Sequence, residues 1–296
     1  YLYVKRNADR QLEQIISDME SPGYVLVARQ MGKTNLLFNA ERNLENEKRI
    51  FTYIDLSNLF EEERNCYRNI IDNVIEQNEK YLEQIEPRIK EIRGSDLEPH
   101  KEYTRSLRAI LNCFPGDIII ILDEVDALRS INYSDHIFAQ IRSTYFQRRP
   151  FPEYCRLTYI LSGVIEPTDL IKDKNKSPFN IGEKIYLNDF TIHEHNEFIT
   201  KSQLNIDRNI SDYIFFWTNG NPRLTFDICS EIENYIIEAQ NINKKVIDEI
   251  IHEKYLRNFD IPPIDHIRER IKSNKAVQNA IISMHQGETD ITEDFR

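Results

Sequence analysis

The sequence predicts an α/β fold in which a parallel sheet lies between two layers of helices, followed by an all-helical domain. Up to residue 190, short apolar runs of strand length alternate with segments whose apolar residues recur at helical spacing. This alternation requires right-handed crossover connections, which are typical of a three-layer parallel sheet. After residue 190 only helical patterns remain. We therefore expect a sheet domain over residues 1–190, a helical domain over 191–259, and a linker with a further helical or winged-helix segment over 260–296.

The elements can be placed in order from their breaks and periodicity. Ser21-Pro22-Gly23 and Pro115-Gly116 interrupt the chain before two apolar runs, and Thr191 with Glu194 forms a capping box that begins a helix. Strands are expected at 24–28, 49–56, 118–122, 156–163 and 183–187, and helices at 7–20, 32–46, several within 60–113, 136–149, 191–204, 209–218, 222–240 and 243–258. The fourth strand should lie between the first and the third. His193 and His195, near a helix start, are expected at the surface.

Composition excludes several classes of protein. The formal net charge of −11 argues against the broad basic surface of a generic nucleic-acid binder. The four cysteines have neither metal-ligand nor redox spacing, which favours reduced thiols in a cytoplasmic protein. No segment has the apolar length of a membrane helix, and no signal peptide is visible. We expect a cytoplasmic protein without membrane contact and, in this segment, without nucleic acid. Because the chain lacks an initial Met and ends without a closing element, we also expect one module of a larger protein.

A predicted strand, a short loop and a predicted helix meet at Gly32, Lys33 and Thr34. The phosphate-binding pattern is G-x-x-x-x-G-K-[ST], and Val27 stands where its first glycine should be. In such a loop, backbone N–H groups and the helix N-terminus face an anion. Lys33 would reach the β- and γ-phosphates, and Thr34 would hold Mg²⁺. The alternative is an ordinary turn with a solvated lysine; the strand–loop–helix order favours an ATP or ADP site with Mg²⁺.

A second polar group follows the apolar run of the third strand. Asp123 should lie at the carboxyl end of this strand, near the Mg²⁺, and Glu124 would act on the attacking water as general base. Ser162, at the end of the fourth strand, could contact the γ-phosphate or the water. Ligands of open parallel sheets bind at the carboxyl ends of the strands. The sequence therefore predicts that these side chains and the Gly32-Lys33-Thr34 loop meet at one edge.

With these motifs the chain resembles prokaryotic AAA-like ATPases of the STAND group, within the AAA+ superfamily of P-loop NTPases (ASCE type). The resemblance rests on "YVKRNADRQL", "RQMGKTNLL", "LSGVIEPTDLI", "SPFNIGEKIYLNDF" and "TNGNPRL". It implies that Arg6, in a segment that contacts the nucleotide base, and the loop residues Gln30, Met31 and Asn35 take part in nucleotide binding. That family also tolerates loss of the first glycine.

The resemblance extends to the helical domain, which it implies is a lid. Gly220 can end one helix and Pro222 suits the first turn of the next, so Pro222 and Arg223 are expected near the nucleotide phosphates. Arg148 and Arg149 end the helix after the acidic pair, where a related ATPase carries an arginine that reaches a neighbour's site. The alternative for both arginines is a solvated helix end, favoured by the helix dipole.

The resemblance implies a signalling ATPase that binds ATP, hydrolyses it slowly and changes its oligomeric state with the nucleotide. Homo-oligomers would form through the ATPase domain, sensor and effector domains would flank it, and a role in anti-phage defence is implied by resemblance alone. A DNA-loading AAA+ ATPase of the origin-recognition or transposition-regulator type is the alternative. The acidic charge disfavours it, although "HIRERIKSNK" is a basic stretch. A non-hydrolysing scaffold is disfavoured by Glu124.

Overall fold

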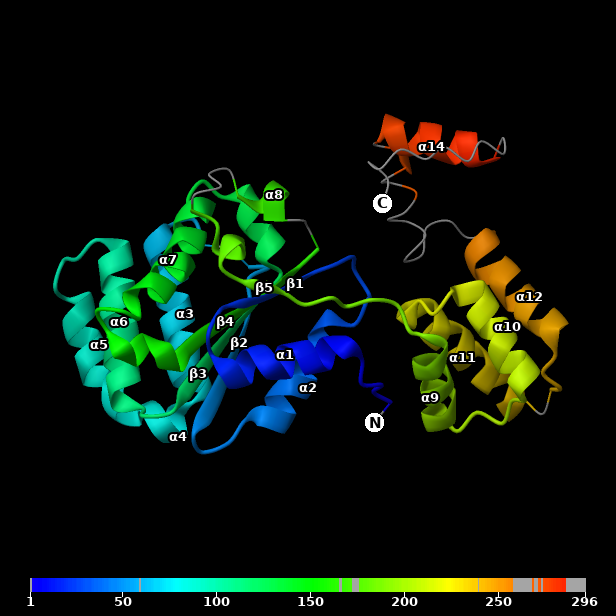
Figure 1. The fold of residues 1–296 in the computed structure, drawn as a ribbon, viewed down its shortest axis with the longest axis horizontal. Helices are drawn as coiled ribbons and strands as arrows, with labels where there is room; N and C mark the ends of the chain where they lie inside the picture. Colours follow the sequence, from blue (N-terminus) through cyan, green and yellow to red (C-terminus); the bar gives the residue numbers. More distant parts are fainter. Residues whose placement is uncertain are drawn as a thin grey trace. The chain divides into compact units, whose positions relative to one another are not determined.

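The computed structural model describes residues 2–58, 60–164, 167–171, 176–238, 240–257, 268, 271–272 and 274–285. The chain divides into two compact units, Tyr3–Asn188 and a second that begins at Asp189 (Figure 1). The boundary expected at residue 190 lies close to this division. The linker expected at 260–265 falls outside the described residues.

The first unit contains one parallel sheet of five strands in the order β2-β3-β4-β1-β5. Its strands are β1 (Gly23–Leu26), β2 (Arg49–Asp55), β3 (Asp117–Asp123), β4 (Leu157–Gly163) and β5 (Glu183–Lys184). The predicted α/β fold class is confirmed, and β4 lies between β3 and β1 as expected.

The fifth strand is shorter than the sequence suggested. Its ladder joins Glu183 and Lys184 to the first two residues of β1, and one more bond runs from the Ile185 N–H to the Tyr24 carbonyl. Ile185 and Leu187 are buried in the core beyond the strand. The segment predicted as a strand over 183–187 therefore pairs only at its start, and Leu187 is buried without strand pairing.

Helices cover both faces of the sheet. The first unit has α1 (Asn7–Asp18), α2 (Lys33–Leu44), α3 (Glu63–Gln77), α4 (Glu79–Leu82), α5 (Glu86–Arg93), α6 (Pro99–Cys113), α7 (Ser134–Gln147) and α8 (Pro167–Leu170), with 3₁₀ turns η1 (Glu83–Ile85), η2 (Val125–Ser130), η3 (Pro152–Arg156) and η5 (Pro178–Asn180). Apolar side chains of α1 and α2 pack on one face of the sheet, and those of α3, α5, α6 and α7 pack on the other.

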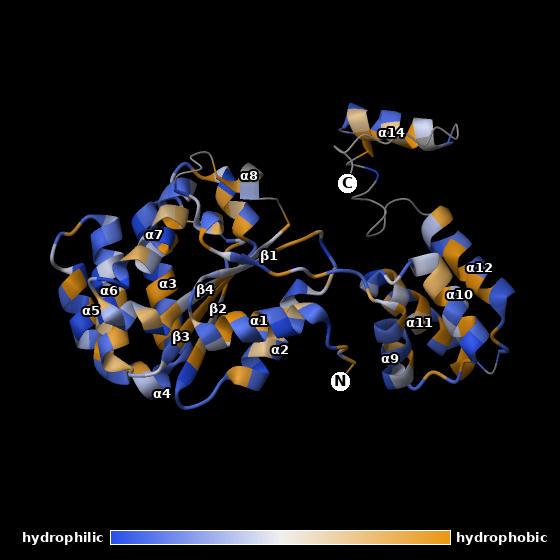
Figure 2. Ribbon diagram, viewed as in Figure 1, coloured by the Kyte–Doolittle hydropathy of each residue, from blue (hydrophilic) through white to orange (hydrophobic). Residues whose placement is uncertain are grey.

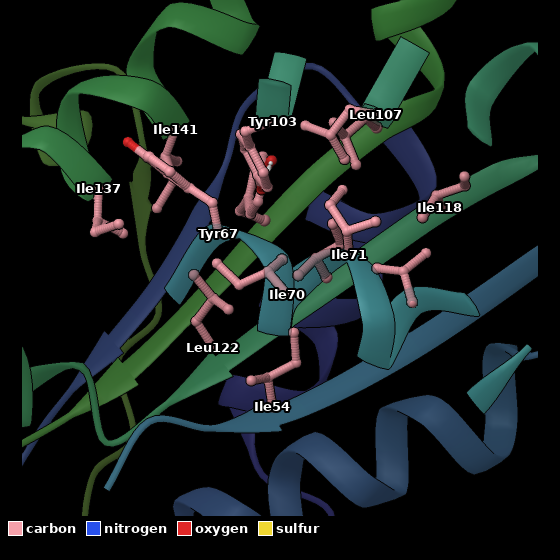
Figure 3. Packing of buried hydrophobic residues seen from close by; sticks show 14 of the residues in the cluster. Ile54, Tyr67, Ile70, Ile71, Tyr103, Leu107, Ile118, Leu122, Ile137 and Ile141 are labelled. Atoms are coloured by element: carbon pink, nitrogen blue, oxygen red, sulfur yellow. Dashed lines mark hydrogen bonds between the residues drawn. The ribbon is translucent and has the colours of Figure 1, made fainter. Parts of the chain in front are cut away.

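The apolar stripes of these helices face the sheet (Figure 2), whose strand β3 is apolar from Ile118 to Leu122. In the larger core, Ile70 and Ile71 of α3 and Leu107 of α6 lie over Ile118 and Leu122 of β3 (Figure 3). Alternate residues of β3 face the smaller core under α1 and α2. Side chains alternate between the two faces along a strand, so Asp123 lies on the same face as Ile119 and Ile121, which α1 and α2 cover.

Side chains bind the outer edge of β2. The Gln77 carboxamide accepts a hydrogen bond from the Tyr53 N–H at 2.9 Å and donates one to the Tyr53 carbonyl at 2.8 Å. The next residue, Asn78, donates to the Phe51 carbonyl at 3.0 Å. The C-terminus of α3 is thereby joined to the edge strand.

The second unit contains α9 (Ile192–Ser202), α10 (Arg208–Thr218), α11 (Pro222–Ile237), α12 (Lys244–Ile251) and the π-helical turn η6 (His252–Leu256); α14 spans Lys275–His285. The Thr191 and Glu194 capping box is present. The surface position expected for His195 is wrong: the ring is fully buried beside Phe215, and Nε2 lies 3.1 Å from the Ser211 carbonyl. Within the described part of the chain, no helix is both long and apolar enough to cross a membrane.

Candidate nucleotide-binding site

The loop between β1 and α2 contains two residues in the left-handed backbone region. Gly32, the N-cap of α2, has φ 88°, and Gln30 has φ 65°. Glycine suits this conformation because it has no Cβ. A Cβ at Gly32 would also approach Arg6 Nη2 to 3.0 Å. The second glycine of the pattern is therefore required by this backbone.

Val27, at the place of the first glycine, extends strand pairing instead of turning. Its N–H donates to the Gly163 carbonyl at 3.1 Å, and its side chain packs against the core. Val27 is not among the described residues with positive φ. A backbone outside the left-handed region accepts a β-branched side chain, which explains why the loop forms without its first glycine.

Arg6 and Met31 support the loop from the core side. The buried Arg6 donates from Nη1 to the Met31 carbonyl at 2.9 Å, and the Met31 side chain belongs to the core under α1. The Arg6 N–H is bound by Asp9 at 2.8 Å, as in a capping box of α1. The sequence predicted both residues as nucleotide ligands. The structure places the Arg6 guanidinium against the loop backbone and the Met31 side chain in the core, and their contact with a nucleotide stays a prediction.

Lys33 is buried at the start of α2. Its Nζ lies 3.3 Å from the Val27 carbonyl and 3.5 Å from the Ala28 carbonyl, which are long contacts for a charged donor. Desolvation lowers the pKa of Lys33, and the nearby carboxylates of Glu124 and Asp123 oppose this shift. A buried ammonium with weak acceptors can bind an anion of higher charge more strongly than it binds these carbonyls.

Asp123 joins Thr34 at the carboxyl edge of the sheet. Its carboxylate is buried, and Oδ2 accepts hydrogen bonds from the Thr34 hydroxyl at 3.4 Å and from the Tyr53 hydroxyl at 2.7 Å. Oδ1 accepts the Glu124 N–H at 2.9 Å. The structure thus brings together the two residues predicted to hold Mg²⁺, which are 89 positions apart. Hydroxyl and carboxylate oxygens are the donors that Mg²⁺ prefers, so this pair fits the metal.

Glu124 follows the strand in a left-handed conformation, with φ 55°. Desolvation raises the pKa of Glu124, and the negative charges of Asp126 and Asp123 raise it further. A carboxylate whose pKa is raised toward neutrality is a better proton acceptor than an exposed one. The predicted role of Glu124 as general base is compatible with this environment and stays a prediction.

Ser162 Oγ and Gln30 Oε1 are buried polar atoms that have no hydrogen-bond partner among the described residues. Ser162 is fully buried in β4 and lies in register with Val25 of β1, on the face of the sheet that carries Asp123. Buried polar groups are normally hydrogen-bonded, so two such atoms are consistent with a ligand. Asn35 is exposed in the first turn of α2, and its contact with a nucleotide stays a prediction.

The sequence did not indicate Tyr53 or Asp126. Tyr53 lies on β2, two residues before Asp55, which pairs in register with Asp123. The period of two in a strand could have placed its side chain on the face of Asp123 once the β2–β3 pairing was known. Asp126 Oδ1 accepts the Val164 N–H at 3.0 Å and thereby fixes the turn after β4. Both residues join the carboxyl ends of the strands through contacts with segments distant in sequence, Tyr53 with Asp123 and Asp126 with Val164.

Arg148 and Arg149 follow α7, and Arg148 lies at the amino ends of the strands, opposite the ends that carry the Lys33 loop and Asp123. Arg148 is bound by backbone carbonyls of its own chain, those of Met19, Glu20 and Leu157, before β1 and at the start of β4. These bonds hold the Arg148 guanidinium within its own fold, and its predicted action in a neighbour's site stays a prediction. Arg149 is exposed and stays a candidate.

Pro222 and Arg223 begin α11 of the second unit. Asn221 caps this helix, and Gly220, with φ 79°, ends the preceding turn. Arg223 Nε donates to Asp227 Oδ2 at 2.8 Å. The predicted contact of these two residues with a nucleotide stays a prediction.

Comparison with known proteins gives a family match over almost the whole chain. A family model described as an AAA-like domain matches residues 1–293. An uncharacterised WD repeat-containing protein of Synechocystis is 30% identical over 313 residues, covering 96% of this chain and 25% of that protein. The chain thus spans about a quarter of the length of this relative.

Solved structures with the same fold include two proteins of Aeropyrum pernix. The ORC1 protein, in complex with DNA, has a TM-score of 0.53 and 13% identity, covering 97% of this chain and 73% of that one. The ORC2 protein, in ADPNP–ADP complexes, has a TM-score of 0.52 and 13% identity, covering 83% and 66%. At this level of identity the two structures bear on the fold alone.

Proposed function

Because the chain belongs to the AAA-like family of AAA+ P-loop ATPases, we propose that it binds ATP or ADP with Mg²⁺ at the Lys33 loop and hydrolyses ATP slowly. The observation that carries this proposal is the meeting of Lys33, Thr34 and Asp123 at the carboxyl edge of β1 and β3. Lys33 supplies the positive charge for the phosphates of a nucleoside triphosphate, and Thr34 and Asp123 supply oxygen atoms for its metal ion.

Binding would use the loop and the start of α2. The Lys33 ammonium would exchange its long contacts with loop carbonyls for the β- and γ-phosphates, and the N-terminal N–H groups of α2 would face the same anion. Thr34 and Asp123 would hold Mg²⁺, which neutralises charge on the phosphates. Gln30 Oε1 and Ser162 Oγ, both buried and without described partners, would gain polar partners in the ligand or its water.

Hydrolysis would depend on Glu124. Its raised pKa lets it accept a proton from a water aimed at the γ-phosphate, while Asp123 stays hydrogen-bonded to the Glu124 N–H. Ser162 would orient the γ-phosphate or the water from the neighbouring strand. The acidic neighbours of Glu124 raise its basicity, and the positive charge of Lys33 lowers it.

We further propose that the protein is a cytoplasmic signalling ATPase of the STAND group. Its nucleotide state would control the formation of homo-oligomers. The larger size of the WD repeat-containing relative supports the view that this domain is combined with sensor and effector domains. A part in anti-phage defence rests on the family resemblance alone.

Two variants test binding and chemistry separately. Lys33→Ala should abolish ATP binding measured by calorimetry, since the phosphates lose their buried cation. Glu124→Gln should bind ATP normally and lose turnover by about 10²-fold or more, because the amide keeps the shape without the base. Lys48→Ala is a matched control, since Lys48 is exposed just before the amino end of β2, whereas the proposed site lies at the carboxyl ends of the strands. Unchanged ATP affinity in Lys33→Ala would reject the site, and unchanged turnover in Glu124→Gln would reject Glu124 as the base.

A further inference from the structure

The shorter of the two hydrogen bonds on Asp123 Oδ2 comes from a residue outside the nucleotide motifs. The Tyr53 hydroxyl donates at 2.7 Å, whereas the Thr34 hydroxyl donates at 3.4 Å. A phenol is ordinarily protonated at neutral pH and can donate its proton to an ionised carboxylate, so the hydroxyl is the donor in this bond.

Tyr53 is held in place from three directions. Gln77 binds both its backbone N–H and its backbone carbonyl. Its ring packs against Phe38 of α2, with ring centroids 4.8 Å apart. Its hydroxyl is bound by Asp123. A side chain fixed at the backbone, the ring and the hydroxyl can impose an orientation on its partner, which a flexible side chain cannot do.

The donors around Asp123 leave a defined part of the carboxylate available. An ionised carboxylate has about four acceptor positions. Glu124 N–H takes one on Oδ1, and the hydroxyls of Tyr53 and Thr34 both lie on Oδ2. Three donors on two oxygens fix the plane of the group. They also direct the proton of the Thr34 hydroxyl to Asp123, so a lone pair of Thr34 Oγ1 is left for a metal.

We propose that Tyr53 is a positioning residue for the magnesium site, which fixes Asp123 through its hydroxyl and touches neither metal nor nucleotide. This role rests on the proposed function. Without the Tyr53 hydroxyl, Asp123 Oδ2 keeps only the longer bond from Thr34, and the carboxylate can turn about its side-chain bonds. Partners that orient metal ligands typically change metal affinity by about 10- to 100-fold when removed.

The test compares wild type with Tyr53→Phe, which deletes one oxygen and retains the ring that packs on Phe38. A fluorescent ATP analogue is bound to each protein, first in EDTA and then with increasing Mg²⁺. In EDTA the two affinities should agree within about twofold, because the Lys33 loop is intact. The Mg²⁺ concentration that gives half of the metal-dependent tightening should rise about 10-fold in Tyr53→Phe.

Tyr186→Phe is the matched control, since Tyr186 is exposed beyond β5 and should leave both measurements unchanged. A normal Mg²⁺ midpoint in a folded Tyr53→Phe protein would overturn the role of Tyr53 alone. An equal loss of affinity with and without Mg²⁺ would also overturn it, because that result means distortion of the loop. Absence of nucleotide binding in the wild type would instead reject the proposed function, and this role with it.

Discussion

The Arg148 guanidinium donates a hydrogen bond of 2.7 Å from Nη2 to the carbonyl oxygen of Leu157, the first residue of β4. Nη1 of the same side chain donates to the Met19 carbonyl at 2.8 Å, in the turn that precedes β1. Arg148, directly after α7, thus connects the segment before β1 with the start of β4, and these two strands are neighbours in the sheet. Desolvation lowers the pKa of Arg148, in agreement with its half-buried position.

We predict that Arg148→Ala destabilises the first unit by about 2–3 kcal/mol, because backbone carbonyls would lose a charged donor. Urea denaturation, followed by a probe in this unit, measures the change. Arg149→Ala is the adjacent control and should stay within about 0.5 kcal/mol of wild type, since Arg149 is exposed. Equal effects of the two substitutions would show that the bonds of Arg148 contribute little.

Arg149 can be tested separately as an arginine that acts across a subunit interface. Its neighbour Arg148 binds at the amino ends of the strands, away from the Lys33 loop, so Arg149 would act on a nucleotide through a second protomer. Arg149→Ala and Lys33→Ala should each be inactive alone, and mixing them should restore part of the ATPase activity. Restoration is expected because some mixed sites combine an intact loop with an intact neighbouring arginine. Co-assembly without any recovery would exclude action in trans.

The burial of His195 predicts a loss of stability of the second unit in acid. Desolvation lowers the pKa of His195, against the opposing effects of the Ser211 carbonyl and Asp212. In the unfolded chain the ring takes up a proton near pH 6.5, whereas the folded ring stays neutral to lower pH. Its contribution to stability is therefore complete above pH 6.5 and is lost as the pH falls toward and through the folded pKa.

Urea midpoints of wild type and His195→Phe at pH 7.5 and 5.5 would measure this contribution. The wild type should lose more stability than the variant, by up to about 1.4 kcal/mol for each pH unit below 6.5. The phenyl ring keeps the packing on Phe215. Parallel behaviour of the two proteins would mean that the ring is protonated in the folded state.

Lys33 should reduce the stability of the protein when no ligand is bound. Its pKa is lowered by desolvation, so the fold disfavours the charged form of the side chain. Lys33→Met keeps the length of the side chain and should raise the free energy of unfolding by about 0.5–1 kcal/mol. It should also abolish stabilisation by Mg-ATP in a thermal melt. A destabilised Lys33→Met protein would show that the contacts of Nζ with Val27 and Ala28 outweigh desolvation.

We predict no tight, sequence-independent binding of duplex DNA by this segment at physiological salt. The formal charge of −11 opposes association with a polyanion. Fluorescence anisotropy with a labelled duplex, repeated between 50 and 200 mM salt, measures both affinity and salt dependence. Nanomolar affinity with a steep salt slope would favour the DNA-loading alternative.

The part of the site that follows strand order could be predicted from sequence. Apolar runs located β1 and β3, and the ends of parallel strands meet at one edge, so Lys33, Thr34 and Asp123 had to converge. The resemblance already allowed Val27 in place of glycine, but the physical reason, the hydrogen bond of its N–H to the Gly163 carbonyl, is visible only in the backbone.

Other features depend on contacts between segments far apart in sequence. Tyr53 enters the site because β2 pairs with β3, and no local pattern marks it. Arg148 has the sequence context of a solvated helix end, yet the length of α7 brings it to the starts of β1 and β4. His195 follows a capping box, where exposure is common, but packing against α10 buries it. Periodicity describes one element at a time and cannot report such contacts.

The bonds that Gln77 and Asn78 make to β2 also bear on association between molecules. An edge strand normally offers unpaired backbone groups to which a foreign strand can add. Here the N–H and carbonyl of Tyr53 and the carbonyl of Phe51 are already engaged, and Arg49 exchanges backbone bonds with Asn46 in a short antiparallel bridge. A strand of a second molecule therefore cannot pair with β2 at these positions. This protects the isoleucine-rich sheet from forming intermolecular β-structure.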